Sequence, residues 1–544
     1  MTELTDRHAA TQGIDRTVSE VVLATTMRYT QYRRDQLDLD AEFEGDLGID
    51  SVVLISIIDD AVKELGLSRQ LAAAVSVANL RELISELESH IPTGPGAERL
   101  ASDPKLAVGE RDSAVPRGIV DWDSRSMRDF MDSRESDLYA NAREFAAHRR
   151  DRETEQLYWY GMPLQSRCTN RALIRDELTG GTREYLMFAS NNYLGLANHP
   201  DVLDAICTAT RAYGATNTGC RIIGGTNELH KELERRLAAF KGREACIVYP
   251  GGYAANLGCI SALSGPRDAV IVDKLNHMSI LDGAKLSGAV RKIYRHNDMA
   301  DLSRVLERSA DQVRGMLIVT DGVFSMHGNI CDLPEIVRLA RAHGARVMVD
   351  DAHATGVLGA RGSGTSEHYG LKGEVDLELG TMSKTLAGMG GFVVGDEEVI
   401  EYLRFYSNSY VFAATIPAGV AAGLIAAIDI IEREPERIAS LWANIHRLRQ
   451  LLDGAGFDLE HSESAIIPIV IGEERRALEM GRAVRARGLF CQTVVFPGVP
   501  LGDARLRISV TSEHTPEDLD LAAQIFIEAG NETGVLTSQG GRQQ

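Results

Sequence analysis

Two patterns of hydrophobic and polar residues divide the 544-residue chain. Near the N-terminus, apolar residues recur every three or four positions, and this spacing predicts helices at about 18–32, 51–65 and 77–89. From about residue 119 onward, short apolar runs alternate with helical patterns instead. The first pattern indicates a small all-helical unit, and the second indicates a larger unit that combines strands with helices.

The larger region has the pattern of a parallel sheet. Parallel strands are buried on both faces and appear as short continuous apolar runs, while their crossover helices keep a helical period. Apolar runs occur at 245–250, 269–274, 315–322, 345–352 and 391–396, with helical patterns at 228–240 and 333–344. We therefore expect a doubly wound α/β domain, followed after about residue 435 by a smaller α+β lobe.

A stretch without apolar periodicity separates the two regions. Residues 91–118 are rich in proline, glycine, alanine and charged residues, which is typical of a linker. The predicted organisation is a helical unit at 1–90, the linker, an N-terminal segment with a large domain at 119–434, and a small C-terminal domain at 435–544.

Composition narrows the choice of partners and environment. The formal net charge of −20 argues against nucleic acid or an anionic membrane surface as a partner, because like charges repel. The seven cysteines form no CxxC pair, which fits a reducing cytoplasm better than a disulfide framework or a zinc site. No secretory signal is visible, and the most apolar run, 418–428, is too short for a membrane span. We expect a cytoplasmic protein.

Candidate catalytic groups gather around Lys384 in the stretch LELGTMSKTLAGMGG. Its glycines would let the backbone approach a bound group closely, and Thr381 and Ser383 offer hydroxyls to a phosphate. Asp350 and His353 follow an apolar run, at the strand end where open α/β sheets bind ligands. Singly, these two residues are equally well explained as a helix cap and a core histidine. Together, an amine, a carboxylate and an imidazole suit pyridoxal phosphate (PLP), because the amine forms a Schiff base and the carboxylate keeps the pyridine nitrogen protonated.

The region from about 135 to 535 resembles the α-oxoamine synthases, fold-type-I PLP enzymes that include amino-oxononanoate synthase, aminolevulinate synthase, aminoketobutyrate ligase and serine palmitoyltransferase. The matching stretches occur in family order: FASNNYLGL, TNTGCRIIGGTNELHKELE, GGYAANLG, LNHMSILDG, TDGVFSMHGN, DDAHATGVLG, GTMSKTLAGMGG, YVFAATIPAG and ARLRISVTSEH. The resemblance implies a PLP-dependent acyltransferase that works as a homodimer.

The same resemblance implies roles in binding the cofactor. Lys384 would carry PLP and later take the α-proton of the substrate, and Asp350 would pair with the pyridine nitrogen. His353 and Ser325 would contact the ring hydroxyl. The remaining implied contacts are the ring-stacking residues His277 and Ala352, and the phosphate-binding positions Thr381, Gly252, Tyr253 and Thr415, the last from a second subunit.

For the amino acid, the resemblance implies that Arg507 binds the carboxylate beside Asn191. A guanidinium suits this task because its planar fork pairs with both carboxylate oxygens. The alternative is that Arg507 is only part of a strand and binds no carboxylate. Cys220 stands where other family members carry threonine or serine near the amino-acid side chain, so it bears on substrate choice. His327, in FSMHGN, replaces the aspartate of the usual FSMDGD.

Ser51 follows Asp50 at the start of a predicted helix, where an Asp-Ser pair is usually a cap. The helical context and the LGIDS stretch also resemble acyl carrier proteins, whose serine holds a 4′-phosphopantetheine arm. A phosphodiester at a helix N-terminus meets free N–H groups and the positive end of the helix dipole. We expect Asp59, Asp60 and Glu64 to face outward. Together with Glu42, Glu44 and Asp46 of the preceding loop, they would form an acidic surface that docks onto basic patches of partner enzymes.

These features predict a decarboxylative condensation of an L-amino acid with an acyl thioester carried on the chain's own carrier unit, giving an α-amino ketone in natural-product biosynthesis. A phosphopantetheinyl transferase and an acyl-loading enzyme would serve the carrier. A flexible linker would make delivery intramolecular, at high effective concentration. Two alternatives remain: an acyl-CoA donor with the N-terminal unit as a docking module, or another reaction on the same fold, such as transamination.

Overall fold

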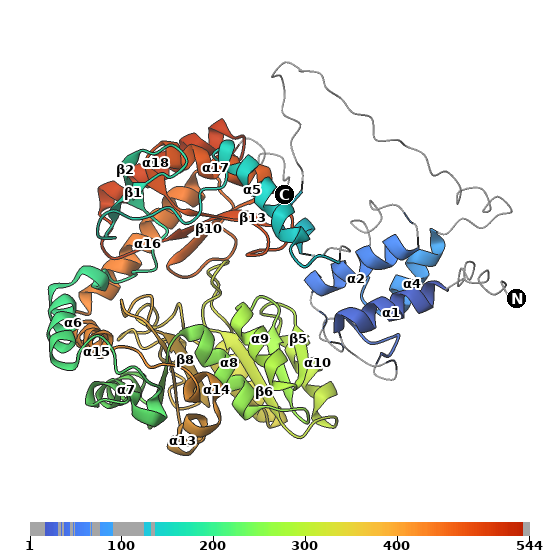
Figure 1. Ribbon diagram of the computed structural model, residues 1–544, viewed down its shortest axis with the longest axis horizontal. Helices are drawn as coiled ribbons and strands as arrows, with labels where there is room; N and C mark the ends of the chain where they lie inside the picture. Colours follow the sequence, from blue (N-terminus) through green and yellow to red (C-terminus); the bar gives the residue numbers. More distant parts are fainter. Residues whose placement is uncertain are drawn as a thin grey trace, which may run out of the picture. The chain divides into compact units, whose positions relative to one another are not determined.

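The computed structural model describes residues 17–90, 125–131 and 136–536, apart from 31–33, 35–36, 44–46, 48, 50, 66 and 68–76. The predicted linker at 91–118 lies outside the described residues. The chain forms two compact units, Met1–Val120 and Asp121–Gln544 (Figure 1). None of the helices in the described ranges combines the length and the apolar character that a membrane crossing requires.

Within its described residues, the N-terminal unit forms the helices α1 (Val18–Thr30), α2 (Ser51–Glu64) and α4 (Leu80–Ser89), close to the three predicted ranges. Their apolar faces meet in one core, to which Val22, Ile57 and Leu83 contribute fully buried side chains. The side chain of Asn79 caps α4 by accepting a hydrogen bond from the Glu82 amide at 2.9 Å. That this unit is an acyl carrier remains a prediction.

The expectation that Asp60 faces outward on α2 is wrong. Asp60 is buried, and its carboxylate accepts hydrogen bonds from the Arg28 guanidinium at 3.2 Å and the Tyr29 hydroxyl at 2.9 Å. The cause is a long-range ion pair, since Arg28 belongs to α1 and helical spacing within α2 cannot reveal it. Only part of the predicted acidic surface therefore faces solvent. Glu44 and Asp46, in the loop before it, lie outside the described residues.

A seven-stranded sheet forms the centre of the second unit, as the predicted doubly wound α/β fold requires. Its strands lie in the order β3-β9-β8-β7-β6-β4-β5. All neighbouring pairs are parallel except those made by β9, which runs antiparallel to β3 and β8. The strands are β3 (Ala245–Tyr249), β4 (Ala269–Asp273), β5 (Val290–Tyr294), β6 (Met316–Asp321), β7 (Arg346–Asp350), β8 (Leu377–Thr381) and β9 (Gly391–Gly395).

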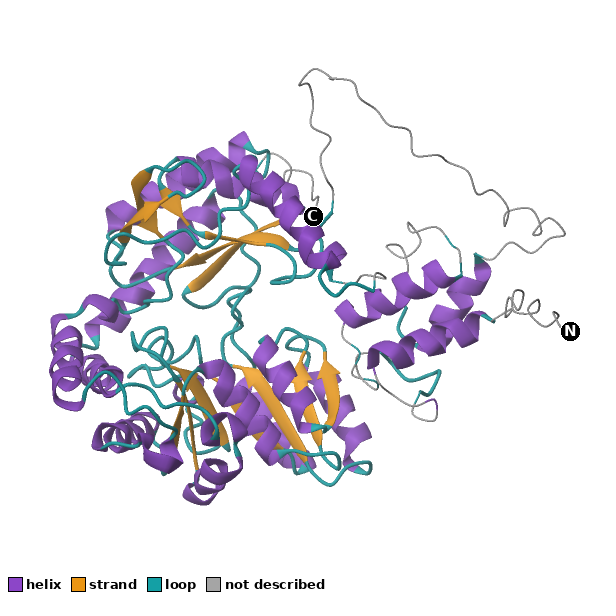
Figure 2. Ribbon diagram, in the orientation of Figure 1, coloured by secondary structure: helices purple, strands orange, loops and turns teal. Residues whose placement is uncertain are grey.

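Helices cover both faces of this sheet (Figure 2). One face packs against α8 (Gly252–Leu263), α9 (Met278–Ser287) and α13 (Glu397–Tyr406). The other face packs against α7 (Glu228–Lys241), α10 (Met299–Ala310) and α11 (Leu333–His343). Burial on both faces explains the continuous apolar runs in the sequence. Two short helices, α12 (Thr365–His368) and α14 (Asn408–Val411), lie in the connections.

The smaller lobe is built from both ends of the second unit. Strand β1 (Arg171–Arg175) pairs antiparallel with β2 (Thr182–Met187), and β2 pairs parallel with β11 (Leu489–Phe490). Residues that were predicted to belong to the large domain thus pair with the C-terminal lobe.

The remaining described elements of the second unit are η3 (Met127–Phe130), α5 (Ala140–Thr154), η4 (Leu196–Asn198), α6 (Pro200–Tyr213), η5 (Arg221–Gly225), α15 (Ala418–Arg433), α16 (Glu436–Gly454), β10 (Ile466–Gly472), α17 (Glu474–Ala486), β12 (Gln492–Val494), β13 (Ala504–Ser509) and α18 (Pro516–Glu532).

A buried ion cluster fastens α7 to the strands beneath the candidate site. The ammonium of Lys241, fully buried at the end of α7, lies 2.7 Å from Asp351 and 3.6 Å from Glu378. Thr365 and Ser366 donate hydrogen bonds to the same two carboxylates, at 2.6 and 2.9 Å. Two buried carboxylates would be costly without the shared cation.

Replacing this cation should strongly destabilise the second unit. We expect Lys241→Met to lower the free energy of unfolding by about 3–5 kcal/mol, because it leaves two buried carboxylates without a counter-charge. Lys372→Met is a matched control, since the Lys372 ammonium is only partly buried and donates to two backbone carbonyls. Chemical denaturation followed by circular dichroism measures the difference. Equal midpoints for the two variants would contradict the role assigned to Lys241.

Candidate active site

A cavity of about 200 Å³ lies where β6, β7 and β8 end and α8 begins. The carboxyl ends of parallel strands meet at one edge of a sheet, so residues far apart in the sequence converge there. Predicted residues that line the cavity are Gly252, Tyr253, His277, Ser325, Asp350, Ala352, His353, Thr381 and Lys384. Asn256, Ser279, Asp321, Val323, Leu379 and Ser383 complete its walls.

Asp350, the last residue of β7, presents a buried carboxylate to the cavity. One oxygen accepts a hydrogen bond from the Asn256 side chain at 2.8 Å, and the other accepts one from the Ala352 amide at 2.9 Å. Two donors stabilise the charged form of a carboxylate and fix its orientation. Asp350 can therefore hold a fixed negative charge against a cationic ring nitrogen.

Lys384 and His353 contact each other in the same cavity. The Lys384 Nζ lies 2.8 Å from His353 Nε2. Burial, partly opposed by the negative charge of Asp350, lowers the pKa of Lys384 to about 8. Burial and the neighbouring Lys384 cation lower the pKa of His353 well below its usual value. The site thus contains a neutral imidazole and an amine that loses its proton near pH 8.

His277 and Asp321 form the wall next to Asp350. The His277 backbone amide donates to Asp321 at 3.1 Å, and its ring Nδ1 lies 2.8 Å from the Ser279 hydroxyl. Burial lowers the pKa of His277. Burial and the adjacent Asp350 carboxylate raise the pKa of Asp321 well above its usual range. The imidazole therefore offers an uncharged ring face, and the raised pKa favours the neutral form of Asp321.

A phosphate-sized group has suitable donors at the other end of the cavity. Helix α8 starts at Gly252, and no side chain caps it, so its first amides are available to an anion. The Thr381 and Ser383 hydroxyls lie 2.9 Å apart beside it. A Cβ added at Gly252 would come within 3.2 Å of Thr381, so glycine keeps this approach open.

Arg507 and Asn191 contact each other next to the cavity rather than in its wall. Both terminal nitrogens of Arg507 lie 3.3 Å from Asn191 Oδ1, and its Nε donates to the Ser325 carbonyl at 2.6 Å. Arg507 lies on β13 and is nearly buried, and its guanidinium contacts residues outside that strand. It also helps to lower the pKa of Lys384, which places its positive charge within electrostatic reach of that amine.

Tyr193 connects His353 with Asn191, and it was not among the predicted site residues. Its hydroxyl oxygen lies 2.7 Å from His353 Nδ1 and 3.2 Å from Asn191 Oδ1. Its position in FASNNYLGL, two residues after the predicted site residue Asn191, was the available signal. Asn256 was also missed, because a contact between α8 and β7 leaves no trace in local spacing.

Among the described residues, Cys220 and Thr415 lie away from this cavity. Cys220 lines a second, apolar cavity of about 360 Å³ together with the exposed side chains of Ile223 and Phe412. The Thr415 amide donates to the Gly219 carbonyl at 3.2 Å in the same region. That Thr415 acts in a second subunit remains a prediction. For Cys220, a contact with the amino acid is not made within one chain.

The residues around the cavity fit PLP. The buried Asp350 carboxylate suits a protonated pyridine nitrogen, the lysine amine suits an aldehyde, and the uncapped α8 terminus with its two hydroxyls suits a phosphate. The Gly252 position supports the same conclusion, since any side chain there would crowd Thr381.

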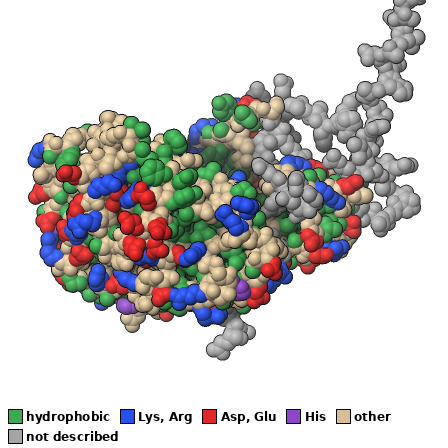
Figure 3. Space-filling view, turned by 90° about the horizontal axis from the view of Figure 1, so that it is seen from below, with side chains coloured by type: hydrophobic (Ala, Val, Ile, Leu, Met, Phe, Trp, Pro, Cys, Tyr) green, Lys and Arg blue, Asp and Glu red, His purple; other side chains and the backbone are tan. Residues whose placement is uncertain are grey.

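Charge is mixed on one face of the protein surface. Acidic and basic side chains are interspersed on the face seen in Figure 3, without a continuous basic field that would hold a nucleic acid.

The sequence of this chain is similar to those of known proteins. Residues 183–526 match the family of class I and II aminotransferases. The chain is 54% identical over 540 residues to the 4-hydroxy-2,2′-bipyrrole-5-methanol synthase PigH of Serratia sp. (strain ATCC 39006), covering 95% of this chain and 81% of that protein. It is 46% identical over 354 residues to the 8-amino-7-oxononanoate synthase of Symbiobacterium thermophilum, covering 65% of this chain and 90% of that one.

A solved structure agrees with these matches. The serine palmitoyltransferase of S. paucimobilis, determined with bound PLP and myriocin, superposes with a TM-score of 0.70 at 33% identity, covering 73% of this chain and all of that one. The predicted mostly parallel fold-type-I architecture is confirmed. The chain is therefore a PLP-dependent acyltransferase and belongs to the α-oxoamine synthase family.

Proposed function

We propose that the chain condenses an L-amino acid with an acyl thioester held on its own N-terminal unit, releasing carbon dioxide and a thiol and giving an α-amino ketone. The observation that carries the proposal is the convergence of Lys384, His353 and Asp350 in one cavity, with Arg507 close by. When bound, PLP would supply an electron sink for negative charge at the α-carbon of the amino acid.

Lys384 is the proposed base of the reaction. Its Nζ loses a proton near pH 8, so a useful fraction is neutral at physiological pH and can accept the α-proton. His353 Nε2, 2.8 Å away, can share that proton without carrying a charge of its own. Asp350 would hold the ring end of the cofactor through its fixed negative charge.

Arg507 and Asn191 are the proposed carboxylate site. The terminal nitrogens of Arg507 face the Asn191 oxygen, a long 3.3 Å contact that a charged ligand can replace with shorter bonds. A carboxylate held there would lie within electrostatic reach of the amine proposed to remove the α-proton, since Arg507 already influences the pKa of Lys384.

The length of the match to PigH supports a role for the N-terminal unit. That match covers 95% of the chain, whereas the match to the 8-amino-7-oxononanoate synthase covers only 65%. The helical unit is therefore shared with a relative named for a natural product. Ser51 begins α2, where a phosphodiester would meet the helix N-terminus. We propose that Ser51 carries 4′-phosphopantetheine, which delivers the acyl group.

The names of two relatives support L-serine as the amino acid. Decarboxylative condensation keeps the side chain of the amino acid on the product, and serine would leave a hydroxymethyl group. PigH is named for a product with a methanol substituent, and the solved relative is a serine palmitoyltransferase. Both names fit serine, and we propose the same amino acid here.

The lowered pKa of Lys384 predicts how cofactor uptake depends on pH. Only the neutral amine attacks the aldehyde, so the uptake rate of the cofactor-free protein should rise with pH and level off above about 8. Arg507→Met should move this midpoint to higher pH, because it removes a cation that lowers the pKa of Lys384. Arg507→Lys keeps a positive charge and is the matched control. Stopped-flow absorbance measures the rate, and an unmoved midpoint in Arg507→Met would contradict the assignment.

The carrier role predicts a modification at one serine. Incubation of the full chain with coenzyme A and a phosphopantetheinyl transferase should add one phosphopantetheinyl group to the intact mass. Ser51→Ala should gain none, while Ser56→Ala, a change on the same helix, should still gain it. Both variants should keep the visible absorbance of bound PLP. Wild-type protein that gains no mass, or equal turnover of acyl-CoA by Ser51→Ala, would support a coenzyme A donor instead.

The serine proposal predicts selectivity for a hydroxyl group. L-serine should perturb the visible spectrum of the holoenzyme at concentrations roughly tenfold or more below those needed for L-alanine, since a site built for the hydroxyl leaves its partners unpaired with alanine. D-serine serves as the stereochemical control. If L-alanine binds as tightly as L-serine, serine is not the substrate.

A further inference from the structure

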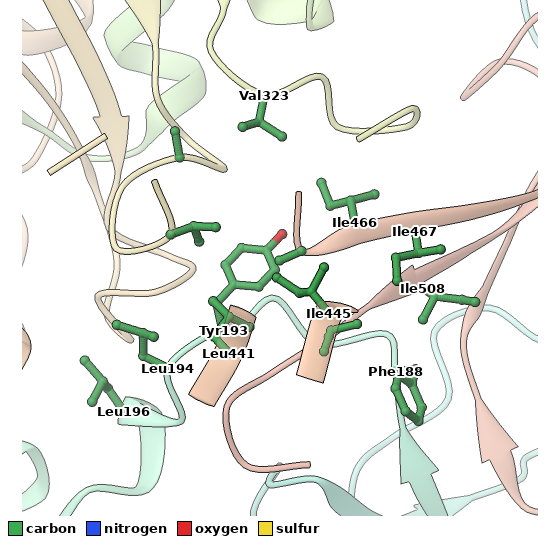
Figure 4. Close-up of a cluster of buried hydrophobic side chains, with 14 of the residues drawn as sticks. Phe188, Tyr193, Leu194, Leu196, Val323, Leu441, Ile445, Ile466, Ile467 and Ile508 are labelled. Carbon is green, nitrogen blue, oxygen red and sulfur yellow. The ribbon is translucent and has the colours of Figure 1, made fainter. Parts of the chain in front are cut away.

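Tyr193 is a fully buried tyrosine whose hydroxyl reaches the site. Its ring lies in a hydrophobic cluster with Val323, Leu441 and Ile466 (Figure 4). Val323 follows β6 of the large domain, while Leu441 and Ile466 belong to α16 and β10. Packing from both lobes therefore fixes the position of the hydroxyl, independently of its hydrogen bonds.

Three successive contacts connect Lys384 with the carboxylate site through this hydroxyl. Lys384 Nζ lies 2.8 Å from His353 Nε2, and His353 Nδ1 lies 2.7 Å from the Tyr193 oxygen. The hydroxyl in turn lies 3.2 Å from Asn191 Oδ1. Both nitrogens of one imidazole are thus engaged, one by the amine and the other by Tyr193.

The number of available protons allows two arrangements of these hydrogen bonds. Burial and neighbouring cations keep His353 neutral, so only one ring nitrogen bears hydrogen. In the first arrangement, Tyr193 donates to Asn191 and accepts from His353 Nδ1–H, which leaves Nε2 free to accept from Lys384. In the second, Tyr193 donates to Nδ1, and Nε2–H points at the lysine. The Tyr193 hydroxyl has one proton, so the two arrangements exclude each other.

Asn191 decides between them through competition for its oxygen. Oδ1 has two lone pairs but four candidate donors, namely Tyr193, Ser509 and two nitrogens of Arg507, all 3.2–3.3 Å away. A carboxylate bound to Arg507 would take the guanidinium donors away from Asn191. The oxygen would then accept from Tyr193, which favours the first arrangement.

We propose that Tyr193 is the positioning residue through which a carboxylate at Arg507 and Asn191 sets which nitrogen of His353 bears the proton. With the carboxylate bound, Nε2 is an acceptor and stabilises a proton on Lys384 Nζ. The amine would thus become the stronger base when an amino acid is in place. The inference rests on the proposed carboxylate site, but it depends on neither the carrier nor the identity of the amino acid.

Other charges also act on this pair. Arg507 from β13, His277 before α9, Asp350 from β7 and Asp321 from β6 all influence Lys384 or His353 electrostatically. A bound carboxylate would partly cancel the field of Arg507 even if Tyr193 had no role. The experiment must therefore separate the hydrogen-bonded route from this direct electrostatic effect.

Nitrogen-15 spectra of the histidine-labelled holoenzyme test the proposal on the wild-type chain. Acetate is the probe, because it offers a carboxylate and nothing else of an amino acid, and acetamide is its uncharged control. His353→Gln assigns the signals. Saturating acetate, but not acetamide, should move the His353 proton from Nε2 to Nδ1. Unchanged His353 signals at saturation would overturn the proposal, whereas failure of the L-serine selectivity test would leave it intact.

Tyr193→Phe separates the two routes. In the wild-type holoenzyme, acetate should raise the pH at which the visible absorbance of the cofactor changes. Tyr193→Phe should lose most of that shift while binding PLP as before, and Tyr294→Phe, another fully buried tyrosine, should retain it. A full shift in Tyr193→Phe would show that the field of Arg507 acts alone and would overturn the proposal.

Discussion

The exclusion of water around Lys384 is the constraint on which the rest of the site depends. Burial is the largest cause of the lowered pKa values of Lys384, His353 and His277 and of the raised pKa of Asp321. A dry site also requires that its remaining polar groups be paired, because an unpaired buried group is costly. The hydrogen bonds from Asn256 to Asp350 and from Arg507 to Ser325 meet part of this requirement, while Asn256 Oδ1 and Asp321 Oδ1 are buried without a hydrogen-bond partner among the described residues.

The large domain and the smaller lobe together exclude water from the site. Residues from both ends of the second unit join them. Strands β10 and β13 bring the C-terminal lobe against the loops that follow β2 and β6. The Ser509 amide donates to the Phe188 carbonyl at 2.8 Å, which ties β13 to the segment that leads to Asn191 and Tyr193. Arg507 thus contacts residues of the large domain through an arrangement that packing of the lobes maintains. A change in lobe packing would alter both the dryness of the cavity and the carboxylate site.

The sequence predicted those features that depend on local order, and it missed those that depend on contacts across the fold. Asp350 could be placed because it directly follows an apolar run, and strands in such a sheet end at one edge. Strand β8 was not expected from LELGT, whose buried Glu378 interrupts the apolar pattern and forms an ion pair with Lys241 from α7. The outward orientation expected for Asp60 failed for the same reason, since Arg28 lies on another helix. Tyr193 resembled an ordinary core residue, because its ring packs in the hydrophobic core. Only its hydroxyl oxygen contacts His353.

Coupling between carboxylate binding and the proton of His353 would suit an enzyme whose base is also the group that carries the cofactor. A lysine with a pKa of about 8 is mostly charged at neutral pH, with a smaller neutral fraction. Making it permanently more basic would reduce that fraction, and a charged amine cannot attack an aldehyde. The same Nζ must therefore be neutral for one step and hold a proton in a later one. A neutral imidazole that can present either a donor or an acceptor meets both needs without moving a charge through a dry cavity. Tyr193 is well placed to select between these states, because its ring is fixed in the core while its single proton can point either way.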